Sequence, residues 1–146
     1  MSFRCPQCLT RHSLEIALSI ELLPDRRSGE ISLQVVSCSV CAFRGLAVYE
    51  ESRHERSDSE SWGHIGYWVS PDAVESVSAA IRSCPFPMNP RCTCAAHTGL
   101  GEQDVYGKWR GLLEMERGHT FKMRIFYGSV EDEQGTDRLD PTTKDD

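Results

Sequence analysis

Two pairs of cysteines carry the strongest chemical signal in the sequence. Two residues separate the thiols of each pair, Cys5 with Cys8 and Cys38 with Cys41. This spacing lets one tight turn aim both sulfurs at one ion, and two such turns supply the four thiolates of a closed tetrahedral zinc shell. The pattern predicts a structural zinc ion, because a catalytic zinc keeps one coordination position open.

The other three cysteines form a second candidate set with a nearby histidine. They lie within a span of 14 residues that also holds three prolines, which stiffen the loop between the first two thiols. Three thiolates and one imidazole are a common closed zinc set. We therefore expect a second zinc ion, bound by Cys84, Cys92, Cys94 and His97. The alternatives are His64 or His54 in place of His97, and a reduced loop without metal.

Enzyme motifs are absent from the sequence. It has no His-Glu-x-x-His pair for a metalloprotease, no Gly-x-x-x-x-Gly-Lys phosphate loop and no Gly-x-Ser-x-Gly nucleophile elbow. The zinc-deaminase pattern needs one residue between its histidine and its glutamate, whereas His54 and Glu55 are adjacent. We therefore predict no catalytic residues and a protein that is not an enzyme.

The elements around the first four cysteines must bring the two pairs together. Residues 13–23 alternate between apolar and polar, which predicts a strand with its apolar side chains, Leu14 to Leu22, on one face. Turn-forming residues at 24–29 lead to a second strand at 31–35, and a third is expected at 43–49. Short connections make these strands an antiparallel meander. The two strands of a hairpin run in opposite directions, so the residues before the first strand lie next to those after the second. The two cysteine pairs therefore meet at that end of the hairpin.

These residues resemble the zinc-ribbon proteins, in which Cys-x-x-Cys knuckles flank a β-hairpin. The resemblance covers residues 3–49, and Leu9 and Ala42 stand where many such knuckles carry glycine. It implies a zinc site but no particular activity, because zinc ribbons serve transcription, translation and protein docking alike.

The later part of the chain predicts one main helix at 71–83. Ser70 can cap the first free amides, Pro71 suits the first helical position, and Asp72 complements the helix dipole. An apolar stripe then runs to Cys84, where the following proline ends the helix. The expected fold is α+β: a zinc-ribbon-like antiparallel meander packed with one main helix, plus the second Cys/His cluster and a C-terminal β-hairpin.

We predict a single zinc-stabilised domain over residues 1–128 and an acidic tail over 129–146. The tail carries seven acidic residues against two basic ones and has no core-forming pattern, so we expect it to be disordered. The parts of the domain are the ribbon at 3–49, a polar loop at 50–61, a short strand near 66–69, the helix at 71–83, the Cys/His loop at 84–98 and a hairpin at 109–127.

Charge and cysteine content limit the partners and the compartment. The formal net charge is −6, of which the tail contributes −5, so residues 1–128 carry −1. A near-neutral body does not favour electrostatic capture of nucleic acid. The sequence holds no apolar run long enough to cross a bilayer, so no membrane partner is expected. Its first residues do not resemble a secretory signal, and seven clustered cysteines then predict a reducing, cytoplasmic location.

The expected function is a non-enzymatic protein-interaction or adaptor module with structural zinc and an unknown protein partner. One alternative is a nucleic-acid-binding zinc-ribbon protein, whose basic patch would comprise Arg4, Arg11, Arg44, Arg53 and Arg56. A second alternative is a small zinc-dependent enzyme, which an open coordination position occupied by water would mark.

Overall fold

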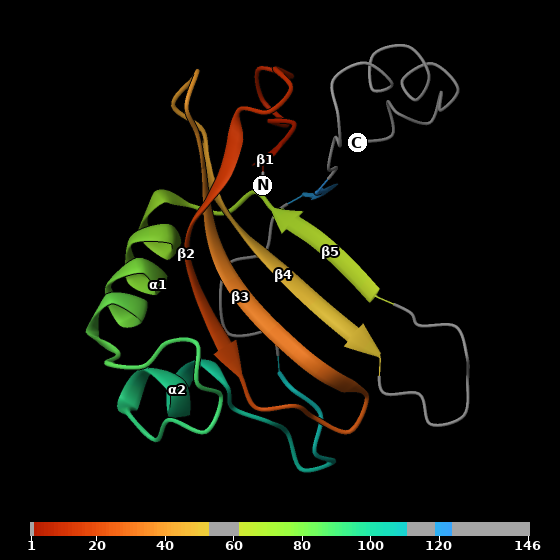
Figure 1. Ribbon diagram of the computed structural model, residues 1–146, viewed down its shortest axis with the longest axis vertical. Coiled ribbons are helices and arrows are strands. Elements are labelled where there is room, and N and C mark those ends of the chain that lie inside the picture. Colours follow the sequence, from red (N-terminus) through yellow and green to blue (C-terminus); the bar gives the residue numbers. More distant parts are fainter. Residues whose placement is uncertain (1, 53–61, 111–118, 124–146) are drawn as a thin grey trace.

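The sheet is a meander, in which strands adjacent in space are also adjacent in sequence (Figure 1). The computed structural model describes residues 2–52, 62–110 and 119–123. Within these residues six strands pair antiparallel in chain order, and two helices follow β5. The predicted α+β combination of a meander and a main helix is therefore present. The elements are β1 (Ser2–Phe3), β2 (Leu14–Leu22), β3 (Ser28–Cys38), β4 (Arg44–Ser52), β5 (Trp62–Tyr67), α1 (Pro71–Ser83), α2 (Ala95–Leu100) and β6 (Thr120–Lys122).

Helix α1 begins and ends where the sequence predicts. The hydroxyl of Ser70 accepts the N–H of Ala73 at 3.1 Å, which satisfies one of the amides left free in the first turn. Cys84 adopts an extended conformation directly before a proline and terminates the helix. The buried stripe of α1 packs against β2, β3 and β4, where it covers one face of the sheet. Its members are Val74, Val77 and Ile81.

A β-bulge divides the apolar stripe of β2 between the two faces of the sheet. Ile16 pairs with Val36, but Leu18 pairs with Val35, so Ala17 is an extra residue in the ladder. Because neighbouring residues of β3 point to opposite faces, the apolar stripe changes face at this residue. The sequence-based expectation that all five side chains share one face is therefore wrong. Leu18, Ile20 and Leu22 pack in the cluster under α1, whereas Leu14 and Ile16 pack on the opposite face.

The opposite face carries a second core cluster built largely from aromatic side chains. Phe121 of β6 lies over Gly66 of β5, at a place where any β-carbon would overlap with the ring. The rings of Phe43 and Trp68 contact Phe121 edge-on, with centroid distances of 5.7 and 6.4 Å. Both faces of the sheet are therefore buried around β3, which explains its run of buried residues from Ile31 to Val36.

Several predicted boundaries differ from those in the structure. The second strand extends over Ser28–Cys38 rather than 31–35, and β4 continues to Ser52, into the predicted loop at 50–61. Residues 53–61 of that loop lie outside the described residues. The predicted short strand near 66–69 is β5, which spans Trp62–Tyr67.

The predicted loop at 84–98 contains the start of α2, a helix of six residues. The side chain of Cys94 accepts the N–H of His97 at 3.4 Å and so acts as the N-cap of this helix. The sequence analysis assigned Cys94 only to metal binding, and the helix is too short to show an apolar period.

The C-terminal hairpin at 109–127 is described only in part. Trp109 forms an isolated bridge with Gln103, and β6 pairs with β5. Within the described residues, β6 therefore extends the meander. Residues 111–118 and 124–127, and the predicted tail at 129–146, lie outside the described residues. In the described part of the chain, neither helix has the length and the apolar character that a bilayer crossing requires.

Candidate metal centres

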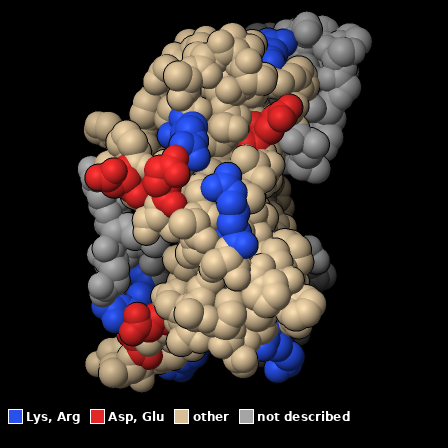
Figure 2. All heavy atoms as spheres, turned by 90° about the vertical axis from the view of Figure 1, so that its left-hand side faces the viewer, with Lys and Arg blue, Asp and Glu red and all other residues tan. Residues whose placement is uncertain are grey.

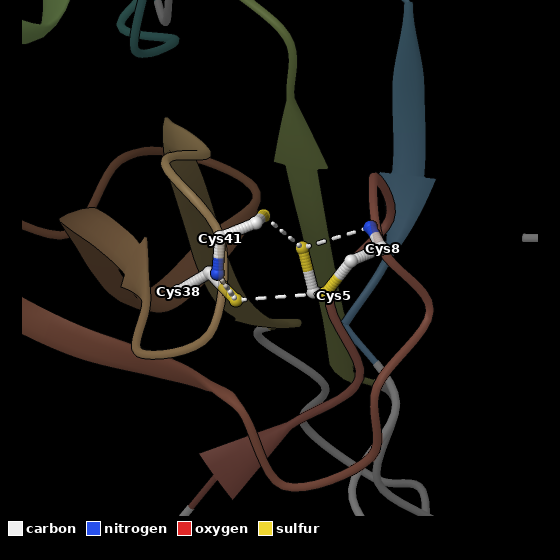
Figure 3. Close-up of side chains that lie close together, drawn as sticks. All are labelled: Cys5, Cys8, Cys38 and Cys41. Atoms are coloured by element: carbon white, nitrogen blue, oxygen red, sulfur yellow. Dashed lines mark hydrogen bonds between the residues drawn. The ribbon is translucent and has the colours of Figure 1, made fainter.

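The first four cysteines converge from two turns at one end of the sheet. Cys5 and Cys8 lie between β1 and β2, while Cys38 ends β3 and Cys41 lies in the turn before β4. The pairing of Leu14 with Cys38 brings the two turns side by side. Figure 3 shows the four thiol groups pointing toward a common centre. The hairpin argument from the sequence therefore predicted the correct neighbours.

The separation of these sulfurs fits a tetrahedral ion. The Sγ–Sγ distance is 3.7 Å between Cys5 and Cys41 and 3.8 Å between Cys8 and Cys38. A zinc ion with four Zn–S bonds of about 2.3 Å requires an edge of about 3.8 Å between sulfurs. All four sulfurs lie within 4.8 Å of one another. The set is thus close enough together to bind one metal ion.

Backbone amides of both knuckles point at the sulfurs. The Cys5 sulfur accepts the N–H groups of Gln7 and Cys8 at 3.3 and 3.5 Å. The Cys38 sulfur accepts those of Val40 and Cys41 at 3.2 and 3.3 Å. A further N–H, from Phe43, lies 3.4 Å from the Cys41 sulfur. Such donors stabilise thiolate charge and orient the ligands around an ion.

The turn after Cys8 has the backbone conformation expected of a knuckle. Leu9 has a positive φ of 63°, and its N–H donates to the carbonyl of Cys5 at 3.0 Å. This is the left-handed region that glycine adopts most easily, at a position where many zinc-ribbon knuckles carry glycine. The Leu9 side chain is 58% exposed, so it stabilises the core little.

The second set of candidate ligands lies where α1 ends and α2 begins. Cys84 follows α1, Cys92 and Cys94 lie in the connecting segment, and His97 lies in α2. The Sγ–Sγ distance between Cys84 and Cys92 is 3.8 Å. The Nδ1 atom of His97 lies 3.3 Å from the Cys84 sulfur and 3.6 Å from the Cys94 sulfur. With Zn–S near 2.3 Å and Zn–N near 2.0 Å, a tetrahedral ion needs an S–N edge of about 3.5 Å.

The other nitrogen of His97 fixes which atom faces the cysteines. Nε2 lies 3.0 Å from the main-chain carbonyl oxygen of Glu21 on β2. A carbonyl only accepts, so Nε2 carries the proton and Nδ1 is left with its lone pair toward the sulfurs. A histidine that ligates zinc commonly donates its second N–H in this way. The geometry is therefore that of an imidazole prepared for a metal ion.

His97, rather than His64, lies with the three cysteines. His64 belongs to β5, where its Nε2 lies 2.7 Å from the side-chain oxygen of Gln34. Its ring contacts Phe3 and Tyr49, with centroid distances of 5.2 and 5.5 Å. His54, the other alternative from the sequence, lies outside the described residues.

Thiol acidity differs within each set. Burial raises the pKa of Cys5 to about 12 and that of Cys84 to about 11. The pKa of Cys94 falls to about 6, chiefly through the backbone N–H of His97. Burial also raises the pKa of Cys38, but the Ser13 hydroxyl and backbone N–H groups outweigh it and lower the value to about 6. Because a bound metal requires thiolates, binding must release protons from the two buried thiols.

The second cluster covers the edge of the sheet. The N–H of Glu21 donates to the carbonyl of Pro87 at 2.8 Å, and the carbonyl of Glu21 accepts from His97. Both outward-facing main-chain groups of this edge residue are thus satisfied by the cluster segment, which protects the edge of β2 from other strands. In Figure 1 this segment lies at the end of β2 opposite the turn that joins β3 and β4. No sequence signal reveals this contact, because both partners on β2 are backbone groups.

Comparison of the chain with protein-family models, with curated proteins and with solved structures found no match. The resemblance of residues 3–49 to zinc ribbons therefore rests on the cysteines and their hairpin alone. What the structure itself shows is two clusters of four side chains, each close enough to bind one metal ion.

Proposed function

We propose that this protein is a non-enzymatic binding module in which two structural zinc ions hold its loops in place. The observation that carries the proposal is the closed geometry of both clusters, each with four ligand atoms within 4.8 Å of one another. Such a set occupies all positions of a tetrahedral zinc ion, so it leaves no position for a substrate. The ion in the first cluster would hold one end of the sheet, and the ion in the second cluster would hold the other end.

The loops that the ions would hold display apolar side chains to solvent. Leu9 and Val40, at the tips of the two knuckles, are 58% and 61% exposed. Phe86 and Met88, between two ligands of the second cluster, are 62% and 57% exposed. Exposed apolar side chains on rigid loops are typical of surfaces that bind other proteins. They support a protein partner, and we propose the cytoplasm as its compartment, since the thiols must stay reduced.

The nucleic-acid alternative depends on a basic patch near the knuckles. Arg44 is engaged by Glu75, with 2.6 Å between Nη1 and the carboxylate oxygen, and Arg53 and Arg56 lie outside the described residues. On the face in Figure 2, which bears α1, acidic and basic side chains are interspersed. Neither observation favours capture of phosphates. The enzyme alternative requires an open coordination position, which a fourth protein ligand at each cluster would fill.

Affinity purification from native cells with paired surface variants tests the proposal. One variant carries Leu9→Ser and Val40→Ser, and the other carries Phe86→Ser and Met88→Ser. We expect one of them to lose a specific protein that the wild type retains after nuclease treatment, with the zinc content of both unchanged. A partner that disappears on nuclease treatment, together with salt-dependent binding of duplex nucleic acid, would support the nucleic-acid alternative instead.

A further inference from the structure

The second cluster lies beside a cavity that reaches two of its ligands. The cavity has a volume of about 360 Å³, and Cys92 and His97 are among the residues that line it. A comparable cavity of about 310 Å³ lies near the first cluster, lined by Gln7, Phe43 and Arg44 but by none of the four cysteines. A small molecule in solution can therefore reach two side chains of the second cluster through the larger cavity. The smaller cavity gives no such access to the cysteines of the first cluster.

The sulfurs of the two clusters also differ in their hydrogen bonds. Six backbone N–H groups donate to sulfurs of the first cluster, the sixth from Thr10 to Cys8. In the second cluster the backbone N–H of His97 donates to Cys94, and that of Phe86 to Cys84. Within the described residues, no backbone N–H donates to the Cys92 sulfur. Hydrogen bonds to a thiolate withdraw charge from it and reduce its nucleophilicity. Cys92 is therefore a stronger nucleophile than Cys84 or Cys94 on this criterion.

We infer that Cys92 and Cys84 form a peroxide-sensitive disulfide site whose oxidation releases the second metal ion. The inference rests on the proposed function, because the cluster must hold zinc before it can release it. It assigns an oxidant of defined class, hydrogen peroxide, which is small enough for the cavity. Cys92 is the residue that reacts with peroxide, because it lines the cavity. Cys84, whose sulfur lies 3.8 Å from that of Cys92, then forms the disulfide with it.

The chemistry balances with one peroxide. The Cys92 thiolate attacks one peroxide oxygen, an S–O bond forms, the O–O bond breaks and hydroxide leaves, which gives a sulfenic acid. The Cys84 thiolate then attacks that sulfur, the S–S bond forms, the S–O bond breaks and a second hydroxide leaves. Two thiolates lose two electrons to the peroxide, and two protons from solvent convert the hydroxides to water. Only Cys94 and His97 then remain as ligands, too few to retain zinc.

Release of the metal would also loosen the edge of the sheet. His97 donates to the Glu21 carbonyl, and Pro87 accepts from the Glu21 N–H, so both bonds depend on how the cluster segment is held. Without the ion, the Cys84–Cys92 disulfide still closes the loop that carries Pro87, but that loop is no longer tied to Cys94 and His97. The amide of Glu21 then becomes the local reporter of oxidation, because its exchange with solvent requires the bond to Pro87 to open.

The test treats the zinc-loaded full-length protein with one equivalent of hydrogen peroxide. A chromogenic chelator records the release of zinc, mass spectrometry maps the disulfide, and hydrogen exchange follows the Glu21 amide. We expect one zinc ion released per chain, a Cys84–Cys92 disulfide, reduced thiols in the first cluster and faster exchange at Glu21. Release from the first cluster should be slower by about tenfold or more. Both ions released at equal rates, or a first disulfide among Cys5, Cys8, Cys38 and Cys41, would overturn the inference.

A variant at the cavity separates access from ligand chemistry. Thr93→Trp narrows the cavity without removing a ligand, and we expect slower release of zinc by peroxide than in the wild type. Ser39→Trp, at an exposed position of the first knuckle, is the matched control and should react like the wild type. Equal rates in all three proteins would contradict the route through the cavity. The zinc content before treatment tests the proposed function separately, since a protein that never held the second ion fails that proposal first.

Discussion

The imidazole of His97 joins the second cluster to the main sheet through the carbonyl of Glu21, with 3.0 Å between Nε2 and the oxygen. One nitrogen of the ring thus faces the sulfurs of Cys84 and Cys94, while the other contacts the edge of β2. The cluster is therefore more than a local loop closure, and its loss must affect β2. This link makes the two roles of His97 separable by mutation.

Replacement of His97 by cysteine should retain the metal and lose the link to β2. Four thiolates are a complete zinc set, so we expect the metal content of His97→Cys to match the wild type. The lost hydrogen bond should lower the free energy of unfolding by about 1 kcal/mol, measured by urea denaturation. His97→Ala is the control and should lose one zinc ion per chain. An unchanged stability of His97→Cys would show that the bond to Glu21 contributes nothing.

Replacement by alanine should affect the stability of the protein differently at two glycines of β5. A β-carbon on Gly66 would overlap with the buried ring of Phe121, whereas one on Gly63 would meet no atom within 4 Å. We expect Gly66→Ala to lower the free energy of unfolding by about 2 kcal/mol through overpacking, and Gly63→Ala to leave it unchanged or slightly higher. Thermal denaturation of the two variants measures the contrast. Equal melting temperatures would refute the close packing of Phe121 on β5.

The carboxylate of Asp25 should stabilise the fold throughout the neutral pH range. It accepts the backbone N–H groups of Arg27, Ser28 and Trp109 at 2.7 to 2.8 Å. Burial raises the pKa of Asp25, but these three donors outweigh burial and hold the pKa below its usual value. The contribution of Asp25 to the free energy of unfolding is therefore fully present above the pKa that this carboxyl has in the unfolded chain. It is lost only as pH falls through the lower pKa that the carboxyl has in the folded protein.

Asp25→Asn should accordingly destabilise the protein by about 2 kcal/mol, by the same amount at pH 6 and pH 8. Asp104→Asn is the matched control, because Asp104 also accepts two backbone N–H groups but is exposed. Its effect should be smaller. Urea denaturation of both variants supplies the comparison, and a cost at Asp25 that changes between pH 6 and pH 8 would contradict this assignment.

The ring of His64 should stay neutral well below the usual histidine range. Burial lowers its pKa to about 4, so the ring donates from Nε2 to Gln34 without carrying a charge. Since the unfolded chain binds a proton near pH 6.5 and the folded chain does not, this residue reduces stability as pH falls from 6.5 toward 4. Nuclear magnetic resonance of the ring protons should show no titration of His64 between pH 7.5 and 5.5. A titration midpoint above pH 6 would contradict the burial of the His64 ring.

The sequence predicted the members of the two Cys/His clusters and α1 because their signals are local. Cys-x-x-Cys spacing names the knuckles directly, and Ser70 with Pro71 marks a helix start within two residues. The hairpin between the knuckles follows from strand periodicity and a turn. These features therefore needed no knowledge of distant contacts.

The bulge at Ala17 and the contacts of Glu21 could not be predicted in this way. Apolar residues continue to alternate through the bulge, and a sheet buried on both faces accepts either phase of that alternation. The bonds of Glu21 to Pro87 and His97 use backbone atoms, which every residue has. Helix α2 is too short for a period, and its cap is a cysteine rather than a preferred capping residue.

The number and coordination of bound zinc ions test the central claim most directly. Metal analysis of the purified full-length protein, combined with X-ray absorption at the zinc edge, gives both quantities. We expect two zinc ions per chain and, from seven thiolates and one imidazole, an average shell of 3.5 sulfurs and 0.5 nitrogens. One ion or none per chain, or a shell that contains oxygen from water, would contradict two closed structural sites.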